Sequence, residues 1–277
     1  MHTINLKGKL VDLDSPWTMG ILNITPDSFF DGGKYQLQKD IEARCAQILS
    51  EGGDIIDVGA YSSRPGAVHV SEEEELHRLR QALTWIRKAH PTAVLSVDTF
   101  RASVSEVLVR EFEVDIINDI SGGMMDEQMF EVIGRLGVPY ILMHMQGTPQ
   151  NMQMNPQYKD LMGDISLYFA QQINKARAKG VKDIILDPGF GFGKTLEQNY
   201  ELLREMKQFD LFGLPMLVGV SRKSMIYKLL DVLPQEALNG TTALNTVALL
   251  NGANILRVHD VKEAAECIKL VRQLNKA

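Results

Sequence analysis

Several features that mark particular protein classes are scarce in this sequence. Two cysteines occur in 277 residues, Cys45 and Cys267, and they lie far apart. This excludes a disulfide framework and indicates a reducing compartment. The net charge of -6 and the pI of about 5.6 argue against a nucleic-acid-binding protein, which usually has a basic face. Residues 1–13 contain no apolar signal core, and no run approaches the roughly 18 apolar residues of a membrane span. We therefore expect a cytoplasmic protein without a nucleic-acid or membrane partner.

Zinc and nucleotide motifs are also missing. The chain has no His-Glu-x-x-His and no paired cysteine set, which argues against a structural zinc site. The segment after the first predicted strand reads NITPDSFFDGG at 23–33, so it lacks the Gly-x-Gly-x-x-Gly of a dinucleotide site. The GKT at 193–195 resembles the end of a phosphate-binding P-loop, but Pro188 stands where that motif needs glycine.

Short apolar runs recur along the whole chain. Their near-continuous Ile, Leu and Val content suits parallel strands that are buried on both faces. Helix-length segments separate them, with a capping box predicted at Ser71 and helix ends at Gly52, Gly137 and Gly180. The eight predicted strands are 19–24, 54–58, 94–97, 115–118, 140–143, 183–186, 216–220 and 255–258.

Eight strand–helix units fit two architectures, a closed barrel or an open doubly wound sheet. Because the dinucleotide motif is missing, we predict an α/β fold of the (β/α)8 TIM barrel type. We expect a single domain over residues 1–277, with its core at about 17–273. The active site of such a barrel lies on the loops that follow the C-terminal ends of the strands.

All eight predicted strand ends carry polar residues. A single polar residue at a strand end usually caps the following helix, but capping alone does not account for all eight. Three of the acidic residues and one histidine have structural alternatives. Asp57, Asp119 and Asp260 are candidates for helix caps or for pairs with buried arginines, and His144 is a candidate core histidine that we leave out of catalysis. The polar strand-end residues and their neighbours are Asn23, Asp57, Asp98, Asn118, Asp119, His144, Asp187, Ser221, Arg222, Lys223, Ser224, Arg257 and His259.

Phosphate and carboxylate binding are the chemistries that these positions favour. Arg257 and His259 are two apart on a strand, so they share a face and suit a phosphate clamp. A salt bridge from Arg257 to a carboxylate is the alternative. The helix that starts near Ser224 offers amide groups to a carboxylate. The glycines at 189–193 predict a close backbone approach to a ligand, which Phe190 or Phe192 would line.

Seven segments together resemble, in order, the signatures of the dihydropteroate synthase family. The resemblance runs from about residue 19 to 260. It implies a TIM-barrel transferase that joins 6-hydroxymethyl-7,8-dihydropterin pyrophosphate to 4-aminobenzoate, releasing pyrophosphate and 7,8-dihydropteroate for folate biosynthesis. It further implies Mg2+, a homodimer, and sulfonamides as inhibitors. The segments are GILNITPDSF at 20–29, SRPG at 63–66, SVDT at 96–99, INDISG at 117–122, LDPGFGF at 186–192, SRKS at 221–224 and RVHD at 257–260.

The resemblance also implies residue roles. Pterin contacts fall on Asp98, Asn118, Asp187, Lys223 and Arg257. Pyrophosphate contacts fall on Asn23, Ser63, Arg257 and His259, with Asn23 as the protein ligand of Mg2+. The aminobenzoate pocket falls on Phe29, Ser63, Arg64, Pro65, Phe192, Lys223 and Ser224. Catalytic roles fall on Asp27, Asp31, Lys223, Arg257 and His259.

Two positions depart from the family pattern, and three other functions compete. Tyr61 stands where a glutamate is usual, and Phe30 stands where a small residue is common. A pterin-dependent methyltransferase shares the barrel and the pterin contacts but needs no pyrophosphate clamp. A non-catalytic pterin-binding paralogue would have lost loop residues that are present here. A Schiff-base aldolase that uses Lys223 is supported by no motif.

Overall fold

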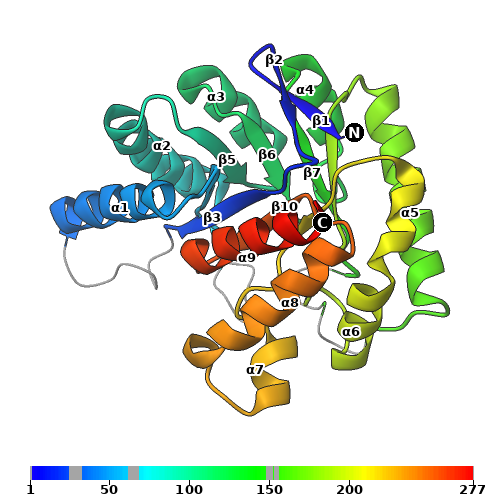
Figure 1. The fold of residues 1–277 in the computed structure, drawn as a ribbon. Coiled ribbons are helices and arrows are strands. Elements are labelled where there is room, and N and C mark those ends of the chain that lie inside the picture. Colours follow the sequence, from blue (N-terminus) through cyan, green and yellow to red (C-terminus); the bar gives the residue numbers. More distant parts are fainter. Residues whose placement is uncertain (1, 25–32, 62–68, 148–151, 153–155, 277) are drawn as a thin grey trace.

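The computed structural model describes residues 2–24, 33–61, 69–147, 152 and 156–276. Its main sheet has eight parallel strands in the order β8-β7-β6-β5-β4-β3-β10-β9, so each strand lies beside its neighbour in the sequence and β10 beside β3 (Figure 1). The strands are β3 (Trp17–Asn23), β4 (Ile55–Gly59), β5 (Val94–Asp98), β6 (Ile116–Asp119), β7 (Tyr140–Met143), β8 (Ile184–Asp187), β9 (Leu217–Val218) and β10 (Ile255–Val258).

The last gap in the ring lies between β8 and β9. A single parallel bridge joins Leu186 to Met216 there. The Leu186 N–H also donates to the Pro215 carbonyl oxygen at 2.8 Å. These contacts complete the circle of strands, so the prediction of a TIM barrel is confirmed and the open doubly wound sheet is wrong.

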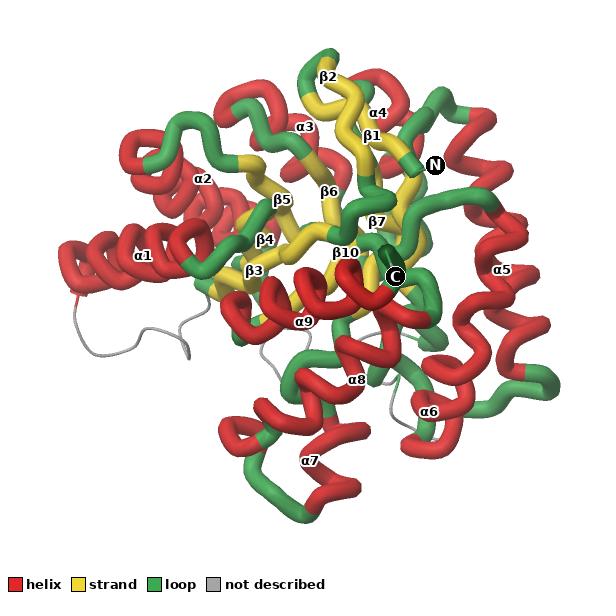
Figure 2. Tube along the Cα trace, viewed as in Figure 1, coloured by secondary structure: helices red, strands yellow, loops and turns green. Residues whose placement is uncertain are grey.

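Helices surround the barrel, as Figure 2 shows. Ser71 caps one of them, since its Oγ accepts the Glu74 N–H at 3.2 Å, while the Glu74 carboxylate accepts from Arg78. Gly137 and Gly180 end two others with φ of 69° and 88°. The helices are α1 (Gly33–Ser50), α2 (Glu72–Ala89), α3 (Ala102–Phe112), α4 (Met129–Leu136), α5 (Leu161–Ala178), α6 (Leu196–Glu205), α7 (Ser224–Leu230), α8 (Leu238–Leu250) and α9 (Val261–Leu274), with 3-10 turns η2 (Met206–Phe212) and η3 (Pro234–Glu236).

An N-terminal hairpin that the sequence analysis missed packs at the start of the strands. Strands β1 (Thr3–Leu6) and β2 (Lys9–Asp12) pair antiparallel around Lys7 and Gly8, whose φ values of 51° and 84° suit a two-residue hairpin turn. Each fully buried aliphatic side chain in this region contributes about 1.5–3 kcal/mol. The buried cluster comprises Ile4, Leu6, Leu13, Met19, Ile55, Ile116, Ile141, Ile185, Leu217 and Ile255.

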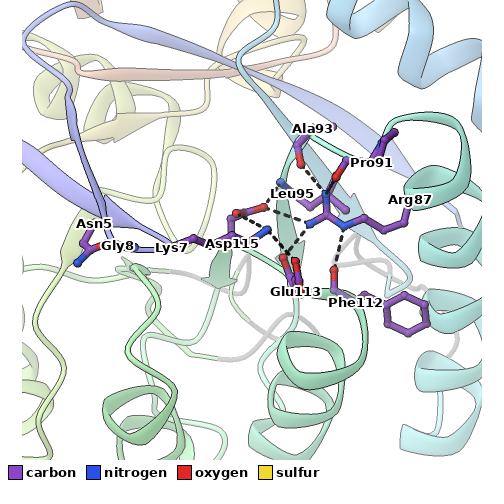
Figure 3. A network of polar contacts seen from close by, with 10 residues as sticks. All are labelled: Asn5, Lys7, Gly8, Arg87, Pro91, Ala93, Leu95, Phe112, Glu113 and Asp115. Atoms are coloured by element: carbon purple, nitrogen blue, oxygen red, sulfur yellow. Dashed lines mark hydrogen bonds and ion pairs between the residues drawn. The ribbon is translucent and has the colours of Figure 1, made fainter.

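A polar network fixes this hairpin to the barrel wall (Figure 3). The Arg87 guanidinium donates to the carbonyl oxygens of Phe112 at 2.8 Å and Ala93 at 2.7 Å. It also lies 3.3 Å from the Asp115 carboxylate, which pairs with Lys7 Nζ at 3.0 Å. The hairpin turn is therefore tied to α2 and to the start of β6. Among the described residues, no helix combines the length and apolarity needed to cross a membrane.

Candidate active site

Arg257 lies at the centre of a polar network at the C-terminal ends of four strands. Its Nε donates to Asp57 Oδ2 at 2.7 Å, and a terminal nitrogen donates to Asp98 Oδ2 at 3.0 Å. Asn118 Nδ2 donates to the same Asp57 oxygen at 3.1 Å. The structure thus brings three predicted pterin residues, Arg257, Asp98 and Asn118, into one cluster around Asp57. The salt bridge from Arg257 to a carboxylate, which the sequence analysis gave as the alternative to a phosphate clamp, is therefore present.

Burial controls the charges in this network. It raises the pKa of Asp98 to about 7, with Arg257 opposing the shift and Asp57 adding to it. Burial also disfavours the charge of Arg257, but Asp57 and Asp98 outweigh it and raise the pKa of the guanidinium. Asp57 is fully buried, and its Oδ1 has no hydrogen-bond partner among the described residues. Arg257 is therefore a permanent cation, whereas Asp98 changes its protonation near neutral pH.

Asp187 and Lys223 form the opposite side of the site. Asp187 ends β8, and its Oδ1 accepts the Gly189 N–H at 2.8 Å. Burial raises the pKa of Asp187, and Lys223 opposes that shift. Burial lowers the pKa of Lys223 to about 8, and Asp187 opposes it in turn. A Cβ built on Gly219 would lie 3.9 Å from Lys223 Nζ and 3.8 Å from Arg257 Cβ, so the two sides meet there.

The loop after β8 places Lys223. Its Nζ donates to the Phe190 carbonyl oxygen and lies 4.7 Å from the centre of the Phe192 ring, which is a cation–π contact. Phe190 itself is fully buried in the main core cluster. Of the two phenylalanines predicted to line a ligand, Phe192 therefore remains the candidate.

The glycines of this loop are required by close contacts within the protein. A Cβ on Gly189 would lie 1.9 Å from the His144 carbonyl oxygen, and one on Gly193 would lie 2.7 Å from the Gln146 carbonyl oxygen. Both residues have positive φ, 70° and 61°. The sequence analysis expected the backbone to approach a ligand here. The observed close approach is to the loop after β7.

His259 lies at the start of the segment that follows β10. Its Nδ1 is 3.2 Å from Ser221 Oγ, and its carbonyl oxygen accepts from Arg44 at 2.6 Å. Burial lowers the pKa of His259 to about 4, and the cations Arg257 and Arg222 add to the shift. The imidazole is therefore neutral at physiological pH. Arg222 Nε donates to Asp260 Oδ2 at 3.0 Å. Of the two alternatives that the sequence analysis gave for Asp260, a helix cap or a pair with an arginine, the structure has the arginine pair.

Two of the remaining strand-end residues have structural roles. Asp119 accepts the N–H groups of Ser121 at 2.7 Å and Gly123 at 2.9 Å, and the Tyr140 hydroxyl at 2.6 Å, so it stabilises a turn. His144 is buried, and its Nδ1 lies 3.1 Å from Lys194 Nζ. The interpretation of His144 as a satisfied core histidine is confirmed.

Asn23 is the residue to which the sequence analysis assigns a magnesium ligand. It ends β3, is partly exposed, and its Oδ1 lies 3.5 Å from the point where a Gly59 Cβ would stand. Asp98 Cβ lies at the same distance from that point, so Asn23 belongs to the same region. The part of the chain that the structure describes holds no group of three or more His, Cys, Asp or Glu arranged for a metal. An amide oxygen together with substrate phosphates is a ligand set that Mg2+ accepts.

Some predicted residues lie outside the described residues, and one described residue was missed. The loops that carry Asp27, Phe29, Phe30, Asp31, Ser63, Arg64 and Pro65 are not described. Tyr61, beside the second of these loops, packs edge-on against Phe100 with ring centres 5.1 Å apart. Ser224 is the first residue of α7. The sequence analysis noted Lys194 only as the end of an incomplete P-loop, although its side chain is buried and contacts the carbonyl oxygens of Gly189 and Phe192.

Comparison with known proteins decides what this site belongs to. The family described as pterin binding enzyme matches residues 19–259. The dihydropteroate synthase of Escherichia coli strain K12 is 44% identical over 269 residues, which cover 96% of this chain and 94% of that protein. The chain belongs to the dihydropteroate synthase family. The predictions of the family, of a transferase and of dihydropteroate synthase activity are confirmed.

Solved structures of family members agree with this assignment. The Yersinia pestis dihydropteroate synthase with a sulfonamide drug complex has a TM-score of 0.91 and 41% identity, with 99% of each chain covered. The Thermus thermophilus enzyme in complex with 4-aminobenzoate has a TM-score of 0.88 and 34% identity, covering 99% of this chain and 100% of that chain. The TIM-barrel scaffold of the family is therefore preserved here over nearly its full length.

Proposed function

We propose that this dihydropteroate synthase breaks the C–O bond of 6-hydroxymethyl-7,8-dihydropterin pyrophosphate before 4-aminobenzoate attacks. The observation that carries the proposal is the pair of facing groups at the strand ends. Arg257 with Asp98 and Asn118 lies on one side, and Asp187 with Lys223 on the other. Together they provide donors, acceptors and two cations around one small region.

The pterin would bind between these two groups. Its 2-amino-4-oxo edge offers parallel N–H donors, and the Asp187 carboxylate can accept them. The Gly189 N–H occupies only one of the roughly four lone-pair directions of that carboxylate. Asp98 and Asn118 would complete the recognition of the ring edge. Lys223 would donate to the ring, and the flat Arg257 guanidinium would stack on it.

The departing pyrophosphate would be held by Asn23, Arg257, His259 and Ser63. Because His259 is neutral and its Nδ1 lies beside Ser221, its other ring nitrogen is available to donate to a phosphate oxygen. Mg2+ bound by Asn23 and the substrate would neutralise part of the negative charge of the pyrophosphate. Arg257 would stabilise the same charge as it develops, which is electrostatic catalysis.

The order of the steps follows from the two reactants. The amine of 4-aminobenzoate is conjugated to a carboxylate-bearing ring and is a poor nucleophile. The dihydropterin ring can delocalise a positive charge on its exocyclic methylene carbon. Asp27 or Asp31 on the first loop would balance this cation and exclude water. The aminobenzoate would then enter beside Phe192, Lys223 and Ser224, with Phe29, Arg64 and Pro65 from the loops completing its pocket.

Substrate that carries 18O in the bridging position tests this order. The protein is incubated with it and Mg2+ in the absence of 4-aminobenzoate. Reversible ionisation predicts that the label scrambles into non-bridging positions, whereas substrate without protein keeps its label. If dihydropteroate forms normally once aminobenzoate is added, but no label scrambles in either the absence of aminobenzoate or the presence of an unreactive analogue, concerted displacement is the better mechanism.

We further propose a cytoplasmic homodimer that is inhibited by sulfonamides, which resemble aminobenzoate. Cys45 and Cys267 are free and buried, as expected in a reducing compartment. Exposed apolar side chains occur on α7, α8, α9 and the segment after α7, and they support a subunit contact on this side. They are Leu229, Leu230, Leu233, Val247, Leu250, Leu270 and Leu274.

Analytical ultracentrifugation tests the dimer. Leu229→Glu and Leu250→Glu should each shift the protein toward the monomer, because a charge would be buried in the contact. Leu10→Glu is the matched control, since Leu10 is an exposed leucine on the distant hairpin. A wild-type chain that sediments as a monomer at all concentrations would overturn the proposal.

A further inference from the structure

Lys194 carries a buried ammonium group that makes contact with three acceptors. Its Nζ lies 3.1 Å from His144 Nδ1, 3.0 Å from the Gly189 carbonyl oxygen and 3.1 Å from the Phe192 carbonyl oxygen. A lysine ammonium has three N–H donors, so each one has an acceptor. Only 4% of the residue is exposed. Among the described residues, no carboxylate lies within ion-pair distance of this lysine.

Burying the Lys194 ammonium costs desolvation free energy, so its presence here needs an explanation. Burial lowers the pKa of Lys194 to about 7, and the more distant charge of Asp187 opposes the shift. The three acceptors favour the charged form, because a neutral amine has only two N–H groups to offer them. A buried apolar residue at this position would avoid the desolvation cost. The contacts of Lys194 therefore have to serve something other than simple packing.

These contacts join two loops at the active site. His144 follows β7, whereas Gly189 and Phe192 belong to the loop after β8. The same loop presents the Phe190 carbonyl oxygen, which accepts from Lys223 Nζ, and the Phe192 ring, which lies against that ammonium. Lys194 thus restrains the segment whose atoms place both Phe192 and Lys223.

The state of His144 agrees with this arrangement. Burial and the charge of Lys194 lower the pKa of His144 well below its usual range. A neutral ring that accepts from Lys194 at Nδ1 carries its proton on Nε2. When Lys194 is protonated, the pair is one cation and one neutral acceptor, so the two side chains do not repel each other.

We propose that Lys194 is a positioning residue for the second substrate, holding Phe192, whose carbonyl oxygen it contacts, in the geometry that 4-aminobenzoate requires. This inference rests on the proposed placement of aminobenzoate beside Phe192 and Lys223. The pterin side depends less on Lys194, because Asp187 is held by β8 itself. In the pairing of β7 with β8, Met143 lies opposite Asp187, and the Asp187 carbonyl oxygen accepts the His144 N–H at 2.9 Å.

Steady-state kinetics of Lys194→Met provide the test. Methionine keeps the apolar stem and removes all three donors. We expect the KM for 4-aminobenzoate to rise about tenfold or more, which is the scale of one to two lost hydrogen bonds. The KM for the pterin pyrophosphate should change less than about threefold. Lys179→Met is the matched control and should leave both KM values unchanged, because Lys179 pairs with Glu131 on the surface.

A second variant keeps the test decisive if Lys194→Met does not fold. His144→Phe removes one acceptor and should give a smaller rise in the same KM, whereas His144→Gln keeps an acceptor and should recover part of the loss. Urea unfolding of each variant reports stability separately. Reduced stability with an unchanged aminobenzoate KM, or equal rises in both KM values, would overturn the positioning role.

The proposed chemistry fails in a different way from the positioning role. Wild-type protein that scrambles no 18O label contradicts the ionising mechanism, whatever Lys194→Met does. A Phe192→Ala variant that keeps the wild-type KM for 4-aminobenzoate would contradict the placement of the second substrate. A normal result in both experiments, together with a silent Lys194→Met, would overturn the inference about Lys194 alone.

Discussion

Ser221 Oγ contacts both the ring and the backbone of His259. It lies 3.2 Å from His259 Nδ1, and it accepts the His259 backbone N–H at 3.2 Å. A hydroxyl that accepts from the backbone is free to donate its own proton to the ring. In this arrangement Nδ1 can accept from Ser221, which leaves the ring proton on Nε2, the nitrogen that would donate to a phosphate oxygen.

Replacing Ser221 by alanine should therefore weaken use of the pyrophosphate substrate. We expect Ser221→Ala to lower kcat/KM for the pterin pyrophosphate about 5- to 30-fold, corresponding to about 1–2 kcal/mol. Ser221→Thr, which keeps the hydroxyl, should recover part of the loss. Ser103→Ala, at an exposed serine that donates to Glu72, serves as control. A Ser221→Ala variant with unchanged kcat/KM would show that His259 needs no fixed ring proton.

Asp187→Asn should disable pterin recognition. An amide cannot accept two parallel N–H groups as a carboxylate does, and it adds donors of its own. We expect kcat/KM for the pterin pyrophosphate to fall. The corresponding loss of transition-state stabilisation should be about 2–4 kcal/mol. The Gly189 N–H contact can be kept by the amide oxygen, so the fold should survive. Near-normal kcat/KM would mean that Asp187 only stabilises the turn after β8.

The affinity for the pterin should depend on pH through Asp98. Its pKa is raised to about 7 by burial, so the carboxylate gains a proton as the pH falls through that value. A protonated carboxyl loses acceptor capacity, so binding of 6-hydroxymethyl-7,8-dihydropterin should weaken below about pH 7. This ligand carries no phosphate whose own titration would interfere. Calorimetry between pH 5.5 and 8 measures the effect, and Asp98→Asn should flatten the profile.

The Asp57–Arg257 pair predicts a rescue of stability without a rescue of activity. Arg257→Met leaves the Asp57 carboxylate buried without its guanidinium partner. We expect a loss of about 3 kcal/mol in the free energy of unfolding, measured with urea. Adding Asp57→Asn should restore much of this loss, since a neutral amide tolerates burial better. The double variant should remain inactive, because the cation at the centre of the site is gone. A double variant as unstable as Arg257→Met would contradict this account.

Parts of this structure follow from local sequence patterns. The apolar runs predict all eight barrel strands, because both faces of each strand are covered and no alternation is needed. Strand β9 is shorter than predicted, Leu217–Val218 instead of 216–220, because Met216 forms only an isolated bridge with Leu186 and the strand pairing ends before Gly219. The hairpin before the barrel was missed because its two strands are four residues each and carry two apolar side chains apiece, too short a pattern to stand out.

The contacts within the site do not follow from local patterns. Arg257 pairs with Asp57 and Asp98 across sequence separations of 200 and 159 residues. A strand-end position predicts that these side chains lie near one another, but it does not predict which of them pair. Lys194 shows the same limit, since its role depends on His144, which lies 50 residues earlier. Burial of a charge is visible only once the fold is known.

The single bridge between β8 and β9 has a consequence for how the enzyme handles its substrate. Asp187 lies at the end of β8, and Lys223 follows β9. The two residues therefore lie on either side of the strand junction with the fewest backbone pairs in the barrel. A pterin bound by both Asp187 and Lys223 would link β8 to the segment after β9. Ligand would then slow amide hydrogen exchange at Leu217 and Val218 more than at the continuously paired strands β3 and β4. The substrate would thus reinforce the junction at which the barrel is closed by the fewest backbone contacts.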